Sequence, residues 1–186
     1  MKIAIFISGS GSLIPSFVEE AENDSFIDID LVLADRKCSG LDRAFDFGLE
    51  ITVFEEFGTD LADFLKKREI DMVCLAGFLG ILPAEFIDAY PGLILNIHPA
   101  LLPKYAGKGM YGDRVHKAVL ESGDEQTGTT IHEVTADVDE GPIVWQKECK
   151  VFPEDDVASL RERVQTLEKE WYALTAYQTL KERLGY

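Results

Sequence analysis

The segment Leu93-Ile94-Leu95-Asn96-Ile97-His98-Pro99 decides the fold class of this 186-residue chain. Its apolar first half predicts a strand that is buried on both faces of a parallel sheet. Asn96 and His98 are two residues apart, so their side chains lie on the same face of that strand. Pro99 then ends the strand, because proline has no N–H for the sheet ladder. Each polar residue alone is typical of ordinary structure, a core histidine and a turn-forming asparagine. Together, at the carboxyl end of a strand where open α/β sheets bind ligands, they favour a functional site.

Strands and helices alternate on both sides of this segment, with short connections between them. That alternation predicts a parallel sheet covered by helices on both faces. We therefore expect a single α/β domain over residues 1–186, with three layers, a mostly parallel twisted sheet of the Rossmann-like kind and a long C-terminal helix. Further strands are expected at residues 2–8, 27–34, 51–54, 71–76, 127–134 and 143–151, and helices after residue 12 and at 41–47, 61–68, 83–90, 115–121 and about 154–185.

The glycine-containing segment Gly9-Ser10-Gly11-Ser12 follows the first expected strand and precedes a helix. Backbone N–H groups and the dipole at a helix N-terminus favour anions, so this loop is a candidate anion site, with Ser12 as the helix cap. Ile14 occupies the place of the third glycine of a GxGxxG motif, and there is no P-loop lysine. A plain strand–helix turn explains these residues equally well.

The composition argues against several classes of function. The formal net charge of −16 makes nucleic acid and anionic membranes poor partners, because both require a basic surface. An anionic substrate must therefore be held by local groups. The three cysteines form no CxxC pair, and the apolar run at residues 3–7 is too short for a signal peptide or a membrane span, so we expect a reducing, cytoplasmic setting. The three histidines lack paired metal-ligand spacing, so we expect no metal.

His98 needs a partner if it is to act as an acid near neutral pH. Asp139, in the acidic turn at residues 137–142, is the best candidate, because a carboxylate beside an imidazole raises its pKa. Acidic turns are common, so the residues alone leave this pairing open. No serine lies in a GxSxG elbow and no cysteine has an evident histidine partner. Direct attack on an acyl carbon, with the oxyanion held by Asn96 and His98, is therefore favoured over covalent catalysis.

Residues 96–105, NIHPALLPKY, resemble the active-site segment of the folate-dependent phosphoribosylglycinamide (glycinamide ribonucleotide) formyltransferases almost letter for letter. The chain is similar to this family over most of its length, and its other matching motifs occur in the family's order. They are ISGSGS at 7–12, GLDRA at 40–44, LAGF at 75–78, GKGMYG at 107–112, GTTIH at 128–132, DEGP at 139–142 and QTLE at 165–168.

The resemblance implies that the cosubstrate 10-formyltetrahydrofolate gives its formyl group to the primary amine of glycinamide ribonucleotide, a step of purine biosynthesis. By position, Asn96 would hydrogen-bond the formyl oxygen, and protonated His98 would stabilise the tetrahedral oxyanion. Asp139 would raise the pKa of His98 and order a proton-carrying water near the hydroxyl of Thr130. The other implied contacts are Gly11, Ser12 and Leu13 with the phosphate, Glu168 with the ribose hydroxyls, and Phe78, Leu79, Gly80, Ile81, Leu82, Thr135, Ala136, Asp137 and Val138 with the folate.

Three departures from the family pattern concern substrate binding rather than the catalytic trio. Leu13 replaces the usual asparagine, residues 55–61 lack the arginine that many members direct at the phosphate, and Gly80 stands where some members carry an arginine near the folate. Lys108 is a candidate for the missing positive charge, although a solvated loop lysine is the simpler interpretation.

Two enzyme alternatives stay open. One is a formyltransferase for another small amine, such as an amino sugar. The other is a 10-formyltetrahydrofolate deformylase, which usually carries an extra amino-terminal domain and a second histidine where this chain has Pro99. A methionyl-tRNA formyltransferase would need a further domain and RNA binding despite the acidic charge. A non-catalytic binding module of the same fold would be favoured if Asn96, His98 and Asp139 were scattered in space. The implied partners are small molecules, and the oligomeric state, a homodimer included, stays open.

Overall fold

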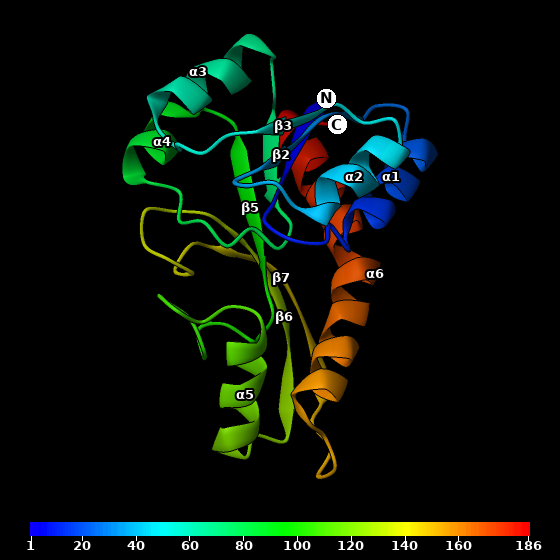
Figure 1. Ribbon diagram of the computed structural model, residues 1–186, viewed down its shortest axis with the longest axis vertical. Coiled ribbons are helices and arrows are strands. Elements are labelled where there is room, and N and C mark those ends of the chain that lie inside the picture. The colour runs from blue at the N-terminus through cyan, green and yellow to red at the C-terminus, as the bar shows by residue number, and fades with distance from the viewer.

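A seven-stranded sheet, in the order β3-β2-β1-β4-β5-β6-β7, runs through the computed structural model, which describes all 186 residues (Figure 1). The strands are β1 (Lys2–Ile7), β2 (Asp28–Ala34), β3 (Ile51–Val53), β4 (Met72–Leu75), β5 (Leu93–His98), β6 (Gln126–Glu133) and β7 (Ile143–Lys150). The helices are α1 (Ile14–Asn23), α2 (Ser39–Asp46), α3 (Thr59–Lys67), α4 (Ala84–Ala89), α5 (Asp113–Ser122) and α6 (Val157–Leu184).

Strands β1 to β5 are parallel, and β6 and β7 extend the sheet in antiparallel pairing. The parallel strands all end at one edge, so the loop after β1, the segment after β4 and the polar end of β5 come together there. The antiparallel register sets His132 of β6 opposite Asn96, and Thr130 opposite His98. The expected α/β fold, a mostly parallel sheet with a long C-terminal helix, is confirmed.

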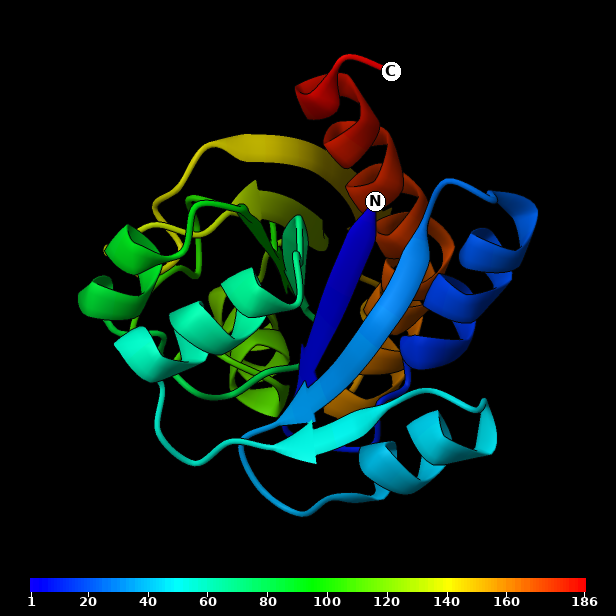
Figure 2. The same cartoon turned by 90° about the horizontal axis from the view of Figure 1, so that it is seen from above.

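Helices cover both faces of the parallel part of the sheet (Figure 2). The side chains of β1 alternate between two apolar cores, as a two-residue period requires. On one face Ile5 shares a core with Phe17 of α1 and Tyr172 of α6. On the other face Phe6 shares a core with Leu65 of α3. Burial of each large apolar side chain contributes about 1.5–3 kcal/mol, so the two cores fix the strand ends that carry the site.

Two helix starts differ from the sequence expectation. The N-cap of α1 is Leu13, with no side-chain hydrogen bond, so Ser12 does not cap the helix. Proline lies in the first turn of α1, where its missing N–H costs no helical hydrogen bond. Before α6, Asp156 is the N-cap, and its carboxylate accepts the Ser159 N–H at 2.8 Å. Residues 154–156 therefore precede the helix rather than fill its first turn.

The longest helix, α6, extends along much of the molecule (Figure 1). Its first half, orange in the figure, lies beside α5, and its second half packs on the sheet through residues such as Tyr172 and Leu180. None of the helices combines the length and the apolar character that crossing a bilayer requires.

Candidate active site

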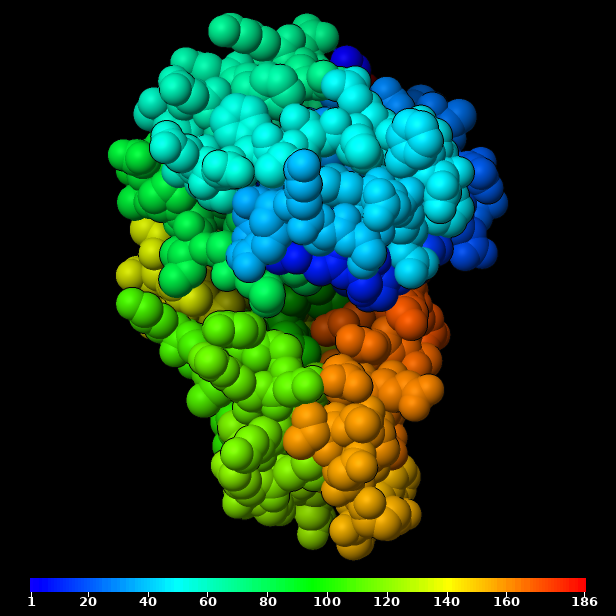
Figure 3. All heavy atoms as spheres, in the orientation of Figure 1, coloured from blue at the N-terminus to red at the C-terminus, as the bar shows by residue number.

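A cavity of about 500 Å³ lies at the carboxyl edge of the parallel strands. Its walls come from the loop after β1, the segments after β4 and β5, the β6–β7 turn and one face of α6. Figure 3 shows the surface hollowed where the blue, green and orange parts of the chain meet. The predicted residues that line the cavity are Ser12, Leu13, Phe78, Leu79, Gly80, Ile81, Leu82, Asn96, His98, Lys108, Thr135, Ala136, Val138, Asp139 and Glu168, whereas Gly11, Thr130 and Asp137 do not line it.

Asn96 is oriented by a histidine on the neighbouring strand. The amide Nδ2 of Asn96 lies 3.0 Å from Nε2 of His132, its cross-strand partner. Nδ1 of His132 donates to the carbonyl oxygen of Glu133 at 2.9 Å, so Nε2 is the ring nitrogen that accepts from the amide. One N–H of Asn96 is therefore used within the protein, and the second has no protein acceptor. This pairing fixes which way the amide faces beside the cavity.

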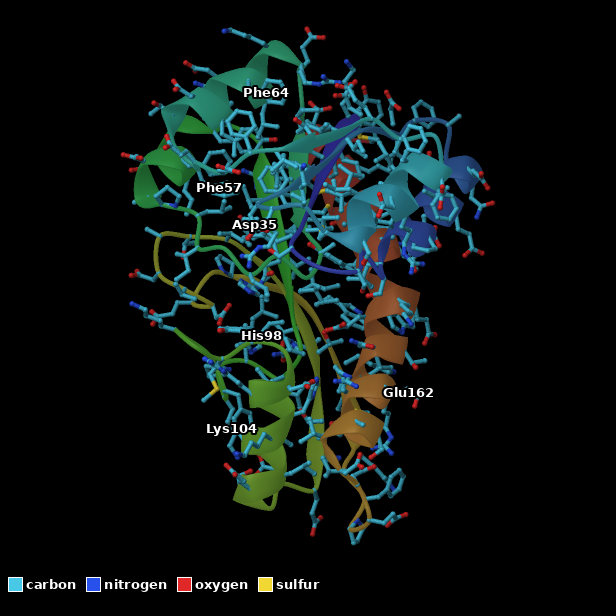
Figure 4. The ribbon with its side chains drawn as sticks, in the orientation of Figure 1. Asp35, Phe57, Phe64, His98, Lys104 and Glu162 are labelled. Carbon is cyan, nitrogen blue, oxygen red and sulfur yellow. The ribbon has the colours of Figure 1, made fainter.

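His98 lies in the middle of the molecule and is only 3% exposed (Figure 4). Its Nε2 donates to the carbonyl oxygen of Tyr105 at 2.9 Å, and its Nδ1 lies 3.6 Å from Oδ2 of Asp139. Burial lowers the pKa of His98 below its ordinary value, and the attraction of Asp139 only partly offsets that effect. Asp139 does raise the pKa of His98, as predicted, but the loss of hydration outweighs this one carboxylate and the net shift is downward.

Asp139 connects both histidines to the loop after β5. Its Oδ2 accepts the N–H of Gly107 at 3.0 Å, and its Oδ1 lies 3.6 Å from Nε2 of His132. Burial alone would raise the pKa of this carboxyl, but His132, His98 and the Gly107 N–H together hold it below its ordinary value. Asp139 is therefore ionised at neutral pH and faces His98. No group of three His, Cys, Asp or Glu side chains has the arrangement that holds a metal ion.

Thr130 has a different place from the one expected. Its side chain is fully buried, and its hydroxyl donates to the carbonyl oxygen of Ala100 at 2.6 Å. The same oxygen accepts from the N–H of Leu102 at 3.0 Å and from Nε2 of Gln146 at 2.9 Å. The hydroxyl is thus fully used within the protein. Thr130 positions the segment after Pro99 and does not face the cavity, which corrects its predicted role as a substrate contact.

Two other predicted contacts also lie outside the cavity wall. Gly11 is packed close to Ile14 and to the backbone of Gly40, beneath the loop surface that Ser12 and Leu13 present. Asp137 lies in the β6–β7 turn, where its carbonyl oxygen accepts the hydroxyl of Thr135 at 3.1 Å. The loop after β1 and the β6–β7 turn both line the cavity, but they do so through the neighbours of Gly11 and Asp137.

The segment after β4 forms an apolar wall. Leu79 and Ile81 are 48% and 58% exposed although both line the cavity, so they offer apolar surface to a ligand. The backbone N–H of Leu79 donates to Oγ of Ser8 at 2.8 Å, which ties the wall to the end of β1. The ring of Phe78 lies against Gly80, where an added Cβ would come within 2.6 Å of it. Gly80 therefore allows Phe78 to pack across the wall.

Several cavity residues were missed by the sequence analysis. His132 was missed because only the antiparallel register of β5 and β6 brings it to Asn96. The others lie on α5 and α6, and one signal was available: residues 161, 165 and 168 are spaced to share one face of a helix. The missed residues that line the cavity include Arg114, His116, His132, Arg161 and Gln165.

Comparisons with known proteins identify the family. Residues 1–176 match the family model described as formyl transferase. The chain is 38% identical to the chloroplastic phosphoribosylglycinamide formyltransferase of Arabidopsis thaliana, covering 100% of this chain and 67% of that protein. It is 35% identical to phosphoribosylglycinamide formyltransferase of Haemophilus influenzae, covering 100% and 92%. The crystal structure of glycinamide ribonucleotide transformylase 1 from Symbiobacterium toebii has a TM-score of 0.89 at 32% identity, covering 98% and 89%. The chain therefore belongs to the formyl transferase family, together with relatives named phosphoribosylglycinamide formyltransferase.

Proposed function

We propose that this enzyme transfers the formyl group of 10-formyltetrahydrofolate to the primary amine of glycinamide ribonucleotide, in purine biosynthesis. The observation that carries the proposal is the convergence of Asn96, His98 and Asp139 on one cavity from distant parts of the chain. The names of the full-length relatives support the choice of substrates. The three free cysteines fit a reducing compartment, so we also propose a cytoplasmic location.

The proposed reaction is direct attack of the amine on the formyl carbon. The formyl oxygen becomes an oxyanion, which the second N–H of Asn96 stabilises by a hydrogen bond. His98 is neutral in the free enzyme because its pKa is lowered. His98 takes up the proton that the attacking amine loses, and the negative charge that develops beside it favours the resulting imidazolium. Asp139 stabilises that imidazolium. As the C–N bond to the folate breaks, a water bound to Asp139 carries that proton from His98 to the folate nitrogen, and His98 becomes neutral again.

The remaining walls suit the two substrates. We propose that the folate ring lies against Leu79 and Ile81 on one side and the turn at Val138 on the other, since all three are apolar and lie exposed on the cavity. The nucleotide then contacts the rest of the wall, which includes Ser12, Leu13 and the side chain of Glu168. Burial raises the pKa of the Glu168 carboxyl to about 8, so at neutral pH it can both donate to and accept from ribose hydroxyls.

The catalytic assignment is tested by removing the oxyanion donors. We expect Asn96→Ala and His98→Ala to lower kcat about 10²–10³-fold, the loss typical of an oxyanion-hole donor. Glu162→Gln is the control, because this exposed side chain lies on the side of α6 away from His98 (Figure 4). A His98→Ala enzyme with full turnover would contradict the assignment.

The substrate assignment is tested by measuring tetrahydrofolate release from 10-formyltetrahydrofolate with a panel of amines. We expect release only with glycinamide ribonucleotide. Release without any amine would identify a deformylase, and release with an unphosphorylated amino sugar would identify a formyltransferase for another amine. Each of these outcomes would replace the proposed reaction.

A further inference from the structure

The cavity must hold an anionic acceptor inside a strongly acidic protein. The chain carries a formal charge of −16, and the ionised carboxylate of Asp139 lines the cavity. A phosphate group would be repelled unless a cation lies close to it. The Lys and Arg side chains that line the cavity are Lys108, Arg114 and Arg161.

Arg161 lies on the same face of α6 as two other cavity residues. Arg161, Gln165 and Glu168 all line the cavity and follow one another at helical spacing. The rise of a helix places Arg161 about 10 Å from Glu168 along the axis. The long side chain of Arg161 lets its guanidinium reach part of the way toward a ligand at Glu168. A nucleotide with its ribose at Glu168 therefore extends along a wall that ends in Arg161.

The guanidinium of Arg161 is held in place but is not saturated. Its Nη1 donates to both carboxylate oxygens of Asp113, at 2.7 and 3.0 Å, and its other nitrogens have no protein acceptor. Both side chains are well exposed, at 41% and 59%. Exposed pairs of this kind contribute little to stability, so a doubly charged phosphate can compete for the guanidinium. The guanidinium of Arg114 instead stacks on Tyr111, 4.9 Å from the ring centre.

A buried polar atom without a partner lies in the same wall. His116 is 1% exposed and lines the cavity, yet its Nδ1 has no hydrogen-bond partner. His116 lies on α5, one turn beyond Asp113. Unpaired buried polar atoms are rare because each one costs free energy, so this nitrogen indicates a group that the ligand supplies.

We propose that Arg161 binds the phosphate monoester of the acceptor, that Asp113 holds its guanidinium ready, and that His116 completes the subsite. This inference rests on the proposed function, because it assumes a phosphorylated acceptor at Glu168. It makes Arg161 the residue that determines preference for phosphorylated over unphosphorylated amines. Arg161 then supplies the charge that residues 55–61 lack.

The test compares Arg161→Met, which keeps the aliphatic stem, with wild type. We expect the KM for glycinamide ribonucleotide to rise about 10- to 100-fold, the loss of one charge-assisted hydrogen-bonded contact, with kcat changed much less. The KM for 10-formyltetrahydrofolate should stay as in wild type. Asp113→Asn should raise the KM for the nucleotide, because the guanidinium of Arg161 loses the group that positions it. Arg183→Met, at the exposed far end of α6, is the matched control.

Calorimetry with ribose 5-phosphate and with ribose separates this inference from the proposed function. Wild type should bind the phosphate sugar and Arg161→Met should bind it weakly, whatever reaction the enzyme performs. An unchanged KM and unchanged ribose 5-phosphate binding in Arg161→Met would overturn the inference. So would a loss seen in Lys108→Ala alone, which would assign the phosphate to Lys108. A wild type that binds ribose 5-phosphate through Arg161 but does not formylate glycinamide ribonucleotide would overturn only the proposed function.

Discussion

At the scale of single residues, Asp139 sets the charge state of His98. Asp139→Asn removes the only negative charge that opposes the effect of burial on this imidazole, so the pKa of His98 should fall further. We expect kcat to drop about 10²-fold or more and the acidic limb of its pH profile to move to lower pH. The measurement is kcat from about pH 5 to pH 9. Asp137→Asn, in the same turn but off the cavity, is the control, and an unmoved acidic limb would refute the coupling.

His116 predicts how stability responds to acid. Burial lowers its pKa to about 4, from 6.5 in an unfolded chain. The folded state therefore disfavours the proton, so the stabilisation is complete above pH 6.5 and is lost as the pH falls toward 4. As the pH falls from about 7 to about 5, we expect the unfolding free energy to decrease by about 2 kcal/mol because of His116. Urea denaturation of wild type, His116→Gln and the exposed Lys117→Gln measures this, and only His116→Gln should flatten the pH dependence.

Some contacts of single residues could be predicted from the sequence, and others could not. Strand periodicity was enough to place Asn96 and His98 side by side, because that relation is local. His132 and the true neighbours of Thr130 depend on contacts about 30 residues apart in the chain, which no local pattern encodes. The net downward shift of the His98 pKa was not predicted for the same reason. Burial is a property of the folded surroundings, and the sequence showed only the carboxylate.

At the scale of elements, the β6–β7 turn depends on one close backbone contact. A Cβ at Gly141 would lie 1.8 Å from the carbonyl oxygen of Glu133, so any other residue must push the two strands apart. We expect Gly141→Ala to lower the unfolding free energy by about 2 kcal/mol or more, and to lower kcat because the turn carries Asp139. Thermal unfolding and kcat are measured together. Gly9→Ala, where an added Cβ meets nothing within 4 Å, should change stability little.

The sequence was enough to predict which segments form strands and which form helices, but not every first and last residue. Every expected strand and helix is present, with ends within about three residues, because each has a clear apolar period. The N-cap of α1 was wrong because Leu13 is held by core burial, which a capping rule for Ser12 does not weigh. The antiparallel direction of β6 and β7 was not assigned, since direction follows from packing between distant segments.

At the scale of the whole molecule, the charge of −16 acts against the compact state through self-repulsion. Added salt screens that repulsion and so stabilises the folded state. Salt also weakens the exposed ion pairs, but that loss is smaller because each pair contributes little to stability. We expect the Tm to rise by roughly 2–5 °C between low salt and about 0.3 M sodium chloride. Chloride is preferred to sulfate, because sulfate resembles the phosphate that the cavity is proposed to bind. A Tm that falls with chloride would show that ion pairs dominate.

The backbone of Asp139 has a positive φ of 60°, a geometry that side chains other than those of asparagine and aspartate rarely tolerate. The main-chain geometry at this position thus favours glycine, asparagine and aspartate, although Glu69 and Tyr105 of this chain adopt a similar φ. Aspartate is the single member of that set with a charge. A library randomised at position 139 should therefore return asparagine and glycine most often among its folded but inactive clones.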